Sequence, residues 1–262
     1  MEKSVKESLI QQLNTVWIFG YGSLTWNPNF IYRSKKIGLL RGYVRRFWQG
    51  NTTQRGTTEK PGRVATLVGR KRAKHPPNKA APHRIKICFI SAYRKSIKII
   101  HFIEFYIPYG QVWGVAYEVE GHEHVLKALG YLNNRETQLG GYTTIVTNFY
   151  ARGHSETDQP INVLLYSATS ENSLYMGPCD MNNMAEQIVK AKGFNGPNTD
   201  YVTKLADFVK QNIPEDKDHH LFLLDRLIRN YSRSRETRLN SHVYHEQMND
   251  VITDYIVDPV VS

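Results

Sequence analysis

The spacing of apolar and polar residues divides this 262-residue chain into a strand-rich first half and a helix-rich last third. Strands are predicted where short runs of β-branched and aromatic residues are bounded by glycine or polar positions. These runs cover residues 16–20, 37–48, 62–68, 112–119, 142–150 and 161–166. Helices are predicted where apolar residues recur every three to four positions. This recurrence covers residues 122–136, 184–192, 198–212 and 219–233.

The first predicted strand ends in a glycine-rich turn, Gly20 to Ser23. Its two glycines allow a tight turn and a close approach of the backbone to a ligand, and successive peptide N–H groups in such a turn can converge on an anion. A dinucleotide-binding loop is excluded because Thr25 replaces the third glycine, and a Walker loop because no Gly-Lys-Ser/Thr follows. The alternative is an ordinary turn in which the glycines serve conformation alone.

The predicted helix over residues 122–136 carries a carboxylate on its apolar face. Val125, Leu129 and Leu132 form a stripe that Glu136 continues at the same spacing. Burial disfavours the charged form of a carboxylate, and a raised pKa suits a general acid or base at neutral pH. The alternative is that the helix frays at Asn133, which would leave Glu136 in a polar turn.

The net charge of +10 is concentrated in one segment. Residues 70–109 hold ten Lys and Arg residues against one acidic residue, Glu104. The strands predicted on either side, 62–68 and 112–119, read as a hairpin interrupted by these ~40 residues. Within the segment, residues 97–106 form an apolar run that predicts a strand or a short helix. Since the basicity is local, we expect no nucleic-acid partner.

Composition indicates a cytoplasmic protein. No apolar run approaches the ~18 residues that a membrane span needs, and the first residues lack the apolar core of a signal peptide. Cys88 and Cys179 give neither a disulfide framework nor the spacing of metal ligands. We therefore expect no membrane partner and no metal.

A set of ordered motifs points to a known family. The chain resembles the ChaC-type, glutathione-specific γ-glutamylcyclotransferases over roughly residues 16–68 and 112–228. The motifs that carry the resemblance are Phe19 to Leu24, Arg45 to Gly50, Pro61 to Val64, Trp113 to Tyr117, Tyr131 to Glu136 and Gly140 to Tyr142.

The resemblance implies an α+β fold, in which helices pack outside a small, mixed β-barrel-like sheet. We expect an N-terminal extension over 1–15, one domain over 16–232 and a C-terminal tail over 233–262. An atypical basic insertion interrupts the domain at about 69–111. We expect either a long surface loop that leaves the barrel intact or a translated non-coding stretch, which consistent retention in transcripts would exclude.

The resemblance also implies an enzyme that cleaves glutathione into 5-oxoproline and cysteinylglycine without a cofactor. The glutamyl amine attacks its own γ-carbonyl group, and Glu136 is the implied general base. Arg55 matches a position suited to a substrate carboxylate, and Tyr166 one that could hydrogen-bond near the reacting centre. The implied loop that holds the γ-glutamyl group consists of Phe19, Gly20, Tyr21, Gly22, Ser23 and Leu24.

Two alternatives to this function stay open. One is the same chemistry on other γ-glutamyl peptides or amines. The other is a non-catalytic binding protein that uses the basic insertion. The sequence does not predict an oligomeric state.

Overall fold

The computed structural model of the chain describes residues 14–69, 84–89, 101–106, 110–138, 141–155 and 157–233. Among these residues, no helix is long and apolar enough to cross a membrane. The predicted tail beyond residue 233 and most of the predicted N-terminal extension lie outside the described residues.

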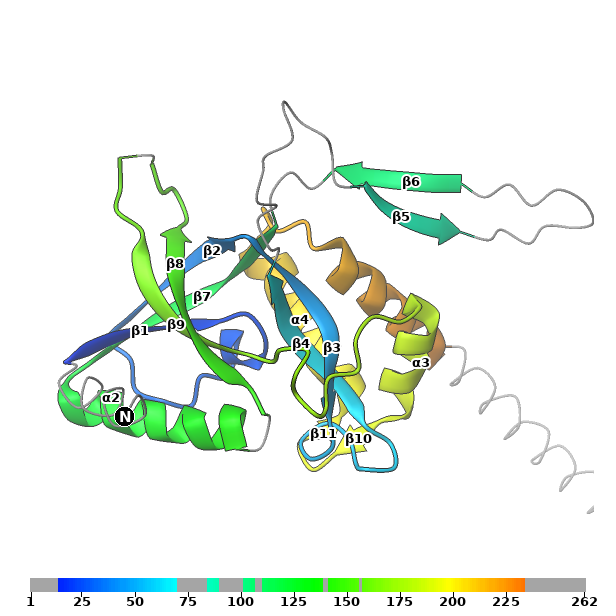
Figure 1. Ribbon diagram of the computed structural model, residues 1–262, viewed down its shortest axis with the longest axis horizontal. Coiled ribbons are helices and arrows are strands. Elements are labelled where there is room, and N and C mark those ends of the chain that lie inside the picture. The colour runs from blue at the N-terminus through cyan, green and yellow to red at the C-terminus, as the bar shows by residue number, and fades with distance from the viewer. Residues whose placement is uncertain are drawn as a thin grey trace, which may run out of the picture.

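Five strands close into a barrel in the order β1-β7-β2-β8-β9 (Figure 1). They are β1 (Thr15–Gly20), β2 (Ser34–Arg41), β7 (Gln111–Glu120), β8 (Thr143–Ala151) and β9 (Ile161–Ser167). Neighbouring strands run antiparallel, except that β1 and β9 are parallel where the barrel closes. The barrel-like sheet of the predicted α+β fold is therefore confirmed.

A second sheet beside the barrel corrects two predictions. It consists of β3 (Tyr43–Asn51) and β4 (Gly62–Gly69), which pair antiparallel. A single strand over residues 37–48 is wrong, because the chain breaks at Gly42, whose φ of 86° favours glycine. The interrupted hairpin is also wrong, because β4 pairs with β3 while β7 pairs with β1 and β2.

The two strands that the structure describes within the insertion are not part of the barrel. Its described residues form β5 (Arg84–Phe89) and β6 (His101–Tyr106), which pair with each other in a separate two-stranded sheet. Of the two alternatives expected for residues 97–106, a strand or a short helix, the structure shows a strand over the last six residues, and 97–100 lie outside the described residues.

The two ends of the insertion meet at one point of the fold. Gly69 pairs with Tyr43 at the start of β3. The N–H group of Gly42 donates a hydrogen bond of 2.6 Å to the carbonyl oxygen of Gly110. Gly69 and Gly110 are therefore both held at the Gly42–Tyr43 junction.

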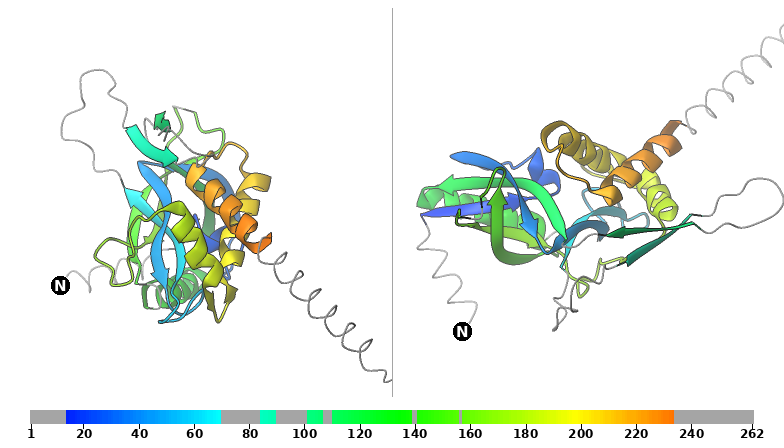
Figure 2. Two further views of the ribbon diagram at one scale, coloured as in Figure 1. Left: turned by 90° about the vertical axis from the view of Figure 1, so that its right-hand side faces the viewer. Right: turned by 90° about the horizontal axis from the view of Figure 1, so that it is seen from above.

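The helices divide between two sides of the molecule. α2 (His122–Leu132) lies against the barrel, whereas α3 (Met181–Lys190), α4 (Asn198–Asn212) and the helix over 219–233 group beside β3 and β4 (Figures 1 and 2). All four were predicted. α3 begins three residues earlier than expected because the Asp180 side chain caps it, accepting a 2.8 Å hydrogen bond from an N–H group in its first turn.

The small pair β10 (Lys192–Gly193) and β11 (Gly196–Pro197) joins α3 to α4. Asn198 is the first residue of α4, and its side chain makes no capping hydrogen bond to the helix. Its buried side chain instead bonds the backbone of Arg63 in β4, donating to the carbonyl oxygen at 2.9 Å and accepting from the N–H group at 2.6 Å. This contact fixes the start of α4 against the second sheet.

A buried charge cluster holds the last helix against both sheets. Arg45 in β3 has a side chain with no exposed surface, and its Nη2 donates a 2.6 Å hydrogen bond to the carbonyl oxygen of Trp113 in β7. Its Nη1 lies 3.2 Å from an oxygen of Asp218 and 3.6 Å from an oxygen of Asp216. Burial raises the pKa of Asp216 to about 6, although Arg45 opposes the shift.

His220 belongs to the same cluster. Its Nε2 accepts a hydrogen bond of 3.4 Å from the N–H group of Phe47, and the two rings stack with centroids 5.9 Å apart. Burial, together with the nearby Arg46, lowers the pKa of His220 to about 4. The imidazole is therefore neutral near pH 7 and remains able to accept this bond.

Candidate active site

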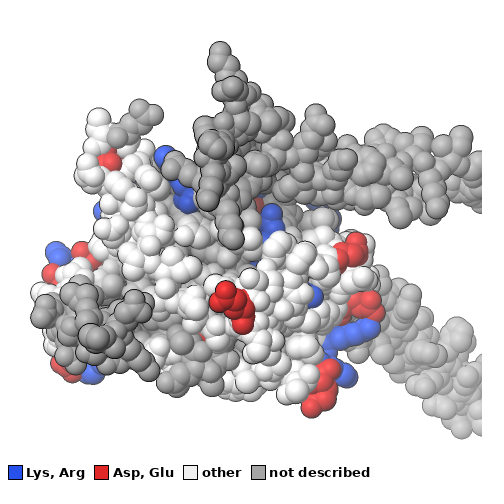
Figure 3. Space-filling view, in the orientation of Figure 1, with Lys and Arg blue, Asp and Glu red and all other residues white. Residues whose placement is uncertain are grey.

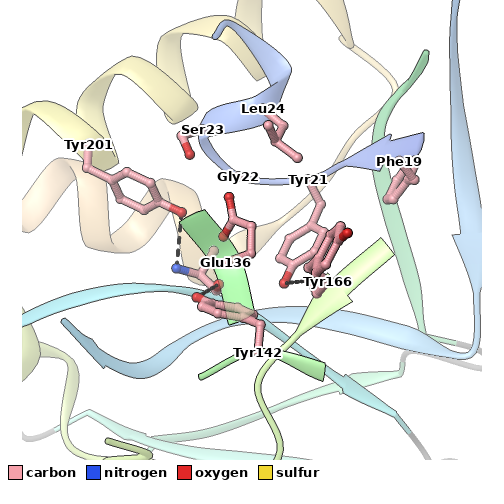
Figure 4. Close-up of a pocket in the computed structure, with 10 residues that line it drawn as sticks. Phe19, Tyr21, Gly22, Ser23, Leu24, Glu136, Tyr142, Tyr166 and Tyr201 are labelled. Atoms are coloured by element: carbon pink, nitrogen blue, oxygen red, sulfur yellow. Dashed lines mark hydrogen bonds between the residues drawn. The ribbon is translucent and has the colours of Figure 1, made fainter. Parts of the chain in front are cut away.

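A pocket lies where the end of β1, the end of α2 and the second sheet meet (Figure 4). Its empty space, including the open mouth, is about 340 Å³. Its lining residues are Phe19, Tyr21, Gly22, Ser23, Leu24, Ala65, Glu136, Tyr142, Tyr166 and Tyr201.

The predicted glycine loop forms one wall of this pocket. After β1 the chain turns into a short 3-10 helix, η1 (Ser23–Thr25), and the Thr25 N–H and hydroxyl both donate to the carbonyl oxygen of Gly22, at 3.0 and 2.8 Å. Gly20 is not itself a lining residue. A Cβ atom there would lie 2.6 Å from the Cβ of Leu24, so glycine allows the turn to close.

Gly22 allows Tyr201 to reach the loop. A Cβ atom at Gly22 would lie 2.6 Å from the hydroxyl oxygen of Tyr201, much closer than van der Waals contact. The same oxygen accepts a 3.2 Å hydrogen bond from the N–H group of Ala65 in β4. A side chain at position 22 would therefore displace Tyr201 from β4 and change the shape of the pocket.

Gly22→Ala is accordingly expected to lower kcat/KM for the substrate by about 10- to 100-fold, because a shift of ~1 Å in a reacting group has an effect of this size. Gly130→Ala is the matched control, since a Cβ atom at this exposed helical position meets no atom within 4 Å. The control should keep full activity and unfold at an equal or higher temperature, because alanine favours a helix over glycine. Equal activity of both variants would contradict this role of Gly22.

Glu136 reaches the pocket because the helix does not fray. α2 continues as a wider π-helical turn, η2 (Asn133–Gln138), and Val125, Leu129 and Leu132 are buried as the stripe predicted. The Glu136 side chain is 18% exposed, and Figure 4 shows it among the tyrosines of the lining. Burial raises the pKa of this carboxyl group, whereas Arg135 acts to lower it.

Four tyrosines from different parts of the fold surround Glu136. The Tyr21 hydroxyl donates to the Tyr166 carbonyl oxygen at 2.8 Å, and the Tyr142 hydroxyl donates to the Ala65 carbonyl oxygen at 2.9 Å. Burial raises the pKa of all four, that of Tyr166 to about 12. These groups are therefore neutral near pH 7. The Tyr201 hydroxyl accepts from Ala65, so its hydrogen is available for a ligand.

Sequence reasoning missed three lining residues, Ala65, Tyr142 and Tyr201. Tyr142 belongs to the Gly140–Tyr142 motif that helped to define the resemblance, so a signal for it was present. Tyr201 lies on the apolar face of α4, where a tyrosine cannot be distinguished by spacing from an ordinary core residue.

Arg55, like Gly20, is a predicted site residue that does not line the pocket. Its Nη1 donates to the carbonyl oxygens of Asn195 and Pro197, at 2.7 and 3.2 Å, and its guanidinium lies 5.9 Å from the centre of the Tyr201 ring. Arg55 therefore lies near the Tyr201 ring, and its contact with a substrate carboxylate stays a prediction.

The arrangement is suited to proton transfer in a confined space. A buried carboxyl group faces a turn rich in peptide N–H groups, and neutral hydroxyl groups surround it. A carboxylate in such surroundings is a stronger base than one in water. In the part of the chain that the structure describes, no cluster of three or more His, Cys, Asp or Glu residues could hold a metal ion.

Known proteins are similar to this chain in sequence and in fold. The family described as ChaC-like protein matches residues 16–231. The human glutathione-specific gamma-glutamylcyclotransferase 1 is 41% identical over 206 residues, which cover 79% of this chain and 75% of the human protein. The protein of the same name from Danio rerio is 35% identical over 84% of this chain and 91% of its own length.

A solved structure agrees with these matches. The crystal structure of a γ-glutamyl cyclotransferase specific to glutathione from yeast superposes with a TM-score of 0.64 at 25% sequence identity. The superposition covers 84% of this chain and 97% of the yeast chain.

Proposed function

We propose, because this chain belongs to the ChaC-like protein family, that it is a γ-glutamylcyclotransferase that cleaves glutathione into 5-oxoproline and cysteinylglycine. The observation that carries the proposal is the buried carboxyl group of Glu136, which faces the Gly20–Leu24 loop across a small pocket. The proposal also includes a cytoplasmic location, since the two cysteines offer no disulfide framework.

The reaction begins with a proton transfer to Glu136. The α-amino group of the glutamyl residue enters as an ammonium ion, which cannot act as a nucleophile while it holds its extra proton. The Glu136 carboxylate accepts that proton and leaves a free amine beside the γ-carbonyl carbon. Burial assists this step because it raises the proton affinity of the carboxylate.

Ring closure then breaks the γ-glutamyl amide bond. The amine nitrogen attacks the γ-carbonyl carbon, and a carbon–nitrogen bond forms within a five-membered ring. When the tetrahedral intermediate collapses, the bond to the cysteinyl nitrogen breaks, and this nitrogen receives the proton that Glu136 holds. The ring nitrogen still carries two hydrogens after the attack, and it passes one of them through the Glu136 carboxylate to the released amine, which leaves as an ammonium ion. The products are 5-oxoproline and cysteinylglycine, and no water is consumed.

The remaining lining residues position the substrate. Nucleophile and carbonyl belong to one molecule, so holding them in attack geometry can provide much of the rate. Peptide N–H groups of the Gly20–Leu24 loop would hold the γ-glutamyl end, and the Tyr201 hydroxyl can donate a hydrogen bond to an oxygen near the reacting carbon.

The face shown in Figure 3 does not support the alternative of a non-catalytic binding protein with a basic surface. There the described Lys and Arg side chains are interspersed with Asp and Glu side chains on a largely uncharged surface. The side chains of the basic insertion lie outside the described residues.

Incubation of the purified full-length chain with glutathione tests the proposed function directly. Mass spectrometry should find 5-oxoproline and cysteinylglycine in equal amounts. A folded protein that forms neither product would refute the proposal. Formation of 5-oxoproline from γ-glutamyl dipeptides but not from glutathione would instead assign the same chemistry to another γ-glutamyl substrate.

A further inference from the structure

Arg135 connects the two halves of the pocket. Its Nε lies 3.0 Å from a carboxylate oxygen of Glu136, and its Nη2 donates a 2.5 Å hydrogen bond to the hydroxyl oxygen of Ser23. Glu136 is the proposed base, and Ser23 belongs to the loop proposed to hold the substrate. One planar guanidinium therefore contacts both groups at once.

Further hydrogen bonds hold the Arg135 guanidinium in place. Its Nη1 donates to the hydroxyl oxygen of Tyr131 at 3.1 Å, and this oxygen also accepts from the side-chain amide of Asn29 at 3.2 Å. The Arg135 side chain is 12% exposed. A mostly buried arginine with partners on three sides has little freedom to move. Its contacts with Glu136 and Ser23 therefore fix the distance between the Glu136 carboxylate and the Ser23 hydroxyl group.

Ser23 and Glu136 belong to elements that are far apart in the sequence. Ser23 follows β1, whereas Glu136 lies in η2, and Arg135 joins them over 112 positions of the chain. A planar guanidinium can bond two acceptors in fixed directions, which the point charge of a lysine cannot do.

We propose that Arg135 is a positioning residue of the active site: it bridges the Gly20–Leu24 loop to the Glu136 carboxylate and so sets where the base stands relative to the bound γ-glutamyl group. The proposal rests on the proposed function. Arg135 need not touch the substrate, because it acts through Glu136 and Ser23.

The charges around Glu136 predict the direction in which its pKa shifts when Arg135 is removed. Arg135 is the ion-pair partner of Glu136 within the described part of the chain, and a cation beside a carboxylate favours its ionised form. The other titratable groups that face the carboxylate are the neutral hydroxyls of Tyr21, Tyr142, Tyr166 and Tyr201. Removing Arg135 should therefore raise the pKa of Glu136.

The first test compares wild type with Arg135→Met, which keeps an unbranched side chain but removes the cation. The Glu136 carboxyl carbon is followed by ¹³C NMR in protein labelled at glutamate, and its resonance is identified by its absence in Glu136→Gln. We expect Glu136 to titrate at higher pH in Arg135→Met, and the acidic limb of the kcat–pH profile to move in the same direction. Arg33→Met, at an exposed ion pair with Glu120, should change neither.

Two milder variants separate the charge from the bridge. Arg135→Lys keeps the cation, so Glu136 should titrate close to wild type, but kcat should fall by at least about tenfold with little change in KM because one contact is lost. Ser23→Ala removes only the acceptor on the loop, and it should lower kcat without moving the Glu136 titration.

The outcomes distinguish this inference from the proposed function. Unchanged Glu136 titration in Arg135→Met, together with kcat within twofold of wild type, would overturn the positioning role. If Arg135→Met does not fold, wild-type kcat in both Arg135→Lys and Ser23→Ala would overturn it equally. Absence of glutathione turnover in wild type would refute the function alone, because the NMR titration needs no substrate.

Discussion

Replacing Glu136 with glutamine is expected to lower kcat for glutathione by about 10²- to 10⁴-fold, the usual contribution of a general base. Glutamine has nearly the same shape as glutamate, and it can keep a hydrogen bond with Arg135, but it cannot accept a proton. KM should change little, because the substitution leaves unchanged the Gly20–Leu24 loop, which is proposed to hold the substrate. The measurement is the initial rate of 5-oxoproline formation at saturating glutathione.

The same substitution should not weaken the fold, which separates a chemical role from a structural one. Burial raises the pKa of Glu136 in the folded state, so above that pKa the ionised carboxylate costs stability. Glu136→Gln removes this cost, and its unfolding temperature at pH 7.5 should equal or exceed that of wild type.

Glu123→Gln provides the control on the same helix, because the Glu123 side chain is 77% exposed and pairs with Lys127. The control should keep wild-type turnover. Full turnover by Glu136→Gln would refute the assignment of the base, whereas a large loss of stability would show that the carboxylate is chiefly structural.

Replacing Arg45 with methionine is expected to lower the free energy of unfolding by about 3–5 kcal/mol. Methionine fills much of the same space but leaves the buried carboxylates of Asp216 and Asp218 without their cation, and the Trp113 carbonyl oxygen without a donor. Urea denaturation followed by far-UV circular dichroism gives the free energy.

Arg152→Met is the comparison for Arg45→Met. Arg152 pairs with Glu215 at 2.8 Å, but both side chains are about two-fifths exposed, so this pair should contribute no more than about 1 kcal/mol. Similar losses in the two variants would contradict a special role for the buried cluster. The pocket is formed by other residues, so Arg45→Met should retain turnover at temperatures where it remains folded.

The helical stripe was the most informative part of the sequence for the site. The spacing of Val125, Leu129 and Leu132 predicts an inward-facing Glu136, and the structure places it in the pocket. The prediction holds for an ideal α-helix, whereas the last turn in the structure is a wider π-helical turn. No residue in Asn133–Gln138 predicts such a turn, because π-helical turns are rare and have no sequence pattern comparable to that of an α-helix.

Strand pairing was predicted less well than strand position. The strands near residues 62–68 and 112–119 exist, but they were assigned to each other because they flank the insertion, and each pairs elsewhere. Hydrophobic patterns identify a strand and its buried face, but they do not name its partner.

Arg45 and Tyr201 were difficult for a related reason. An arginine in a strand reads as a surface residue unless its buried acidic partners are known, and those partners follow more than 170 positions later. Tyr201 has the spacing of an ordinary core residue, and only the structure shows that its hydroxyl group lies beside Gly22. Both interpretations depend on contacts distant in the sequence.

The junction at Gly42–Tyr43 has a consequence for how this domain can vary. Gly69, at the end of β4, and Gly110, just before β7, are already held at the adjacent residues Tyr43 and Gly42, so a connection of almost any length can join them without stretching either strand. The entropic cost of such a connection grows only with the logarithm of its length. The junction is therefore a natural grafting point, where a short turn, a long basic segment or an entire foreign domain could be exchanged for one another while the same catalytic unit folds around it.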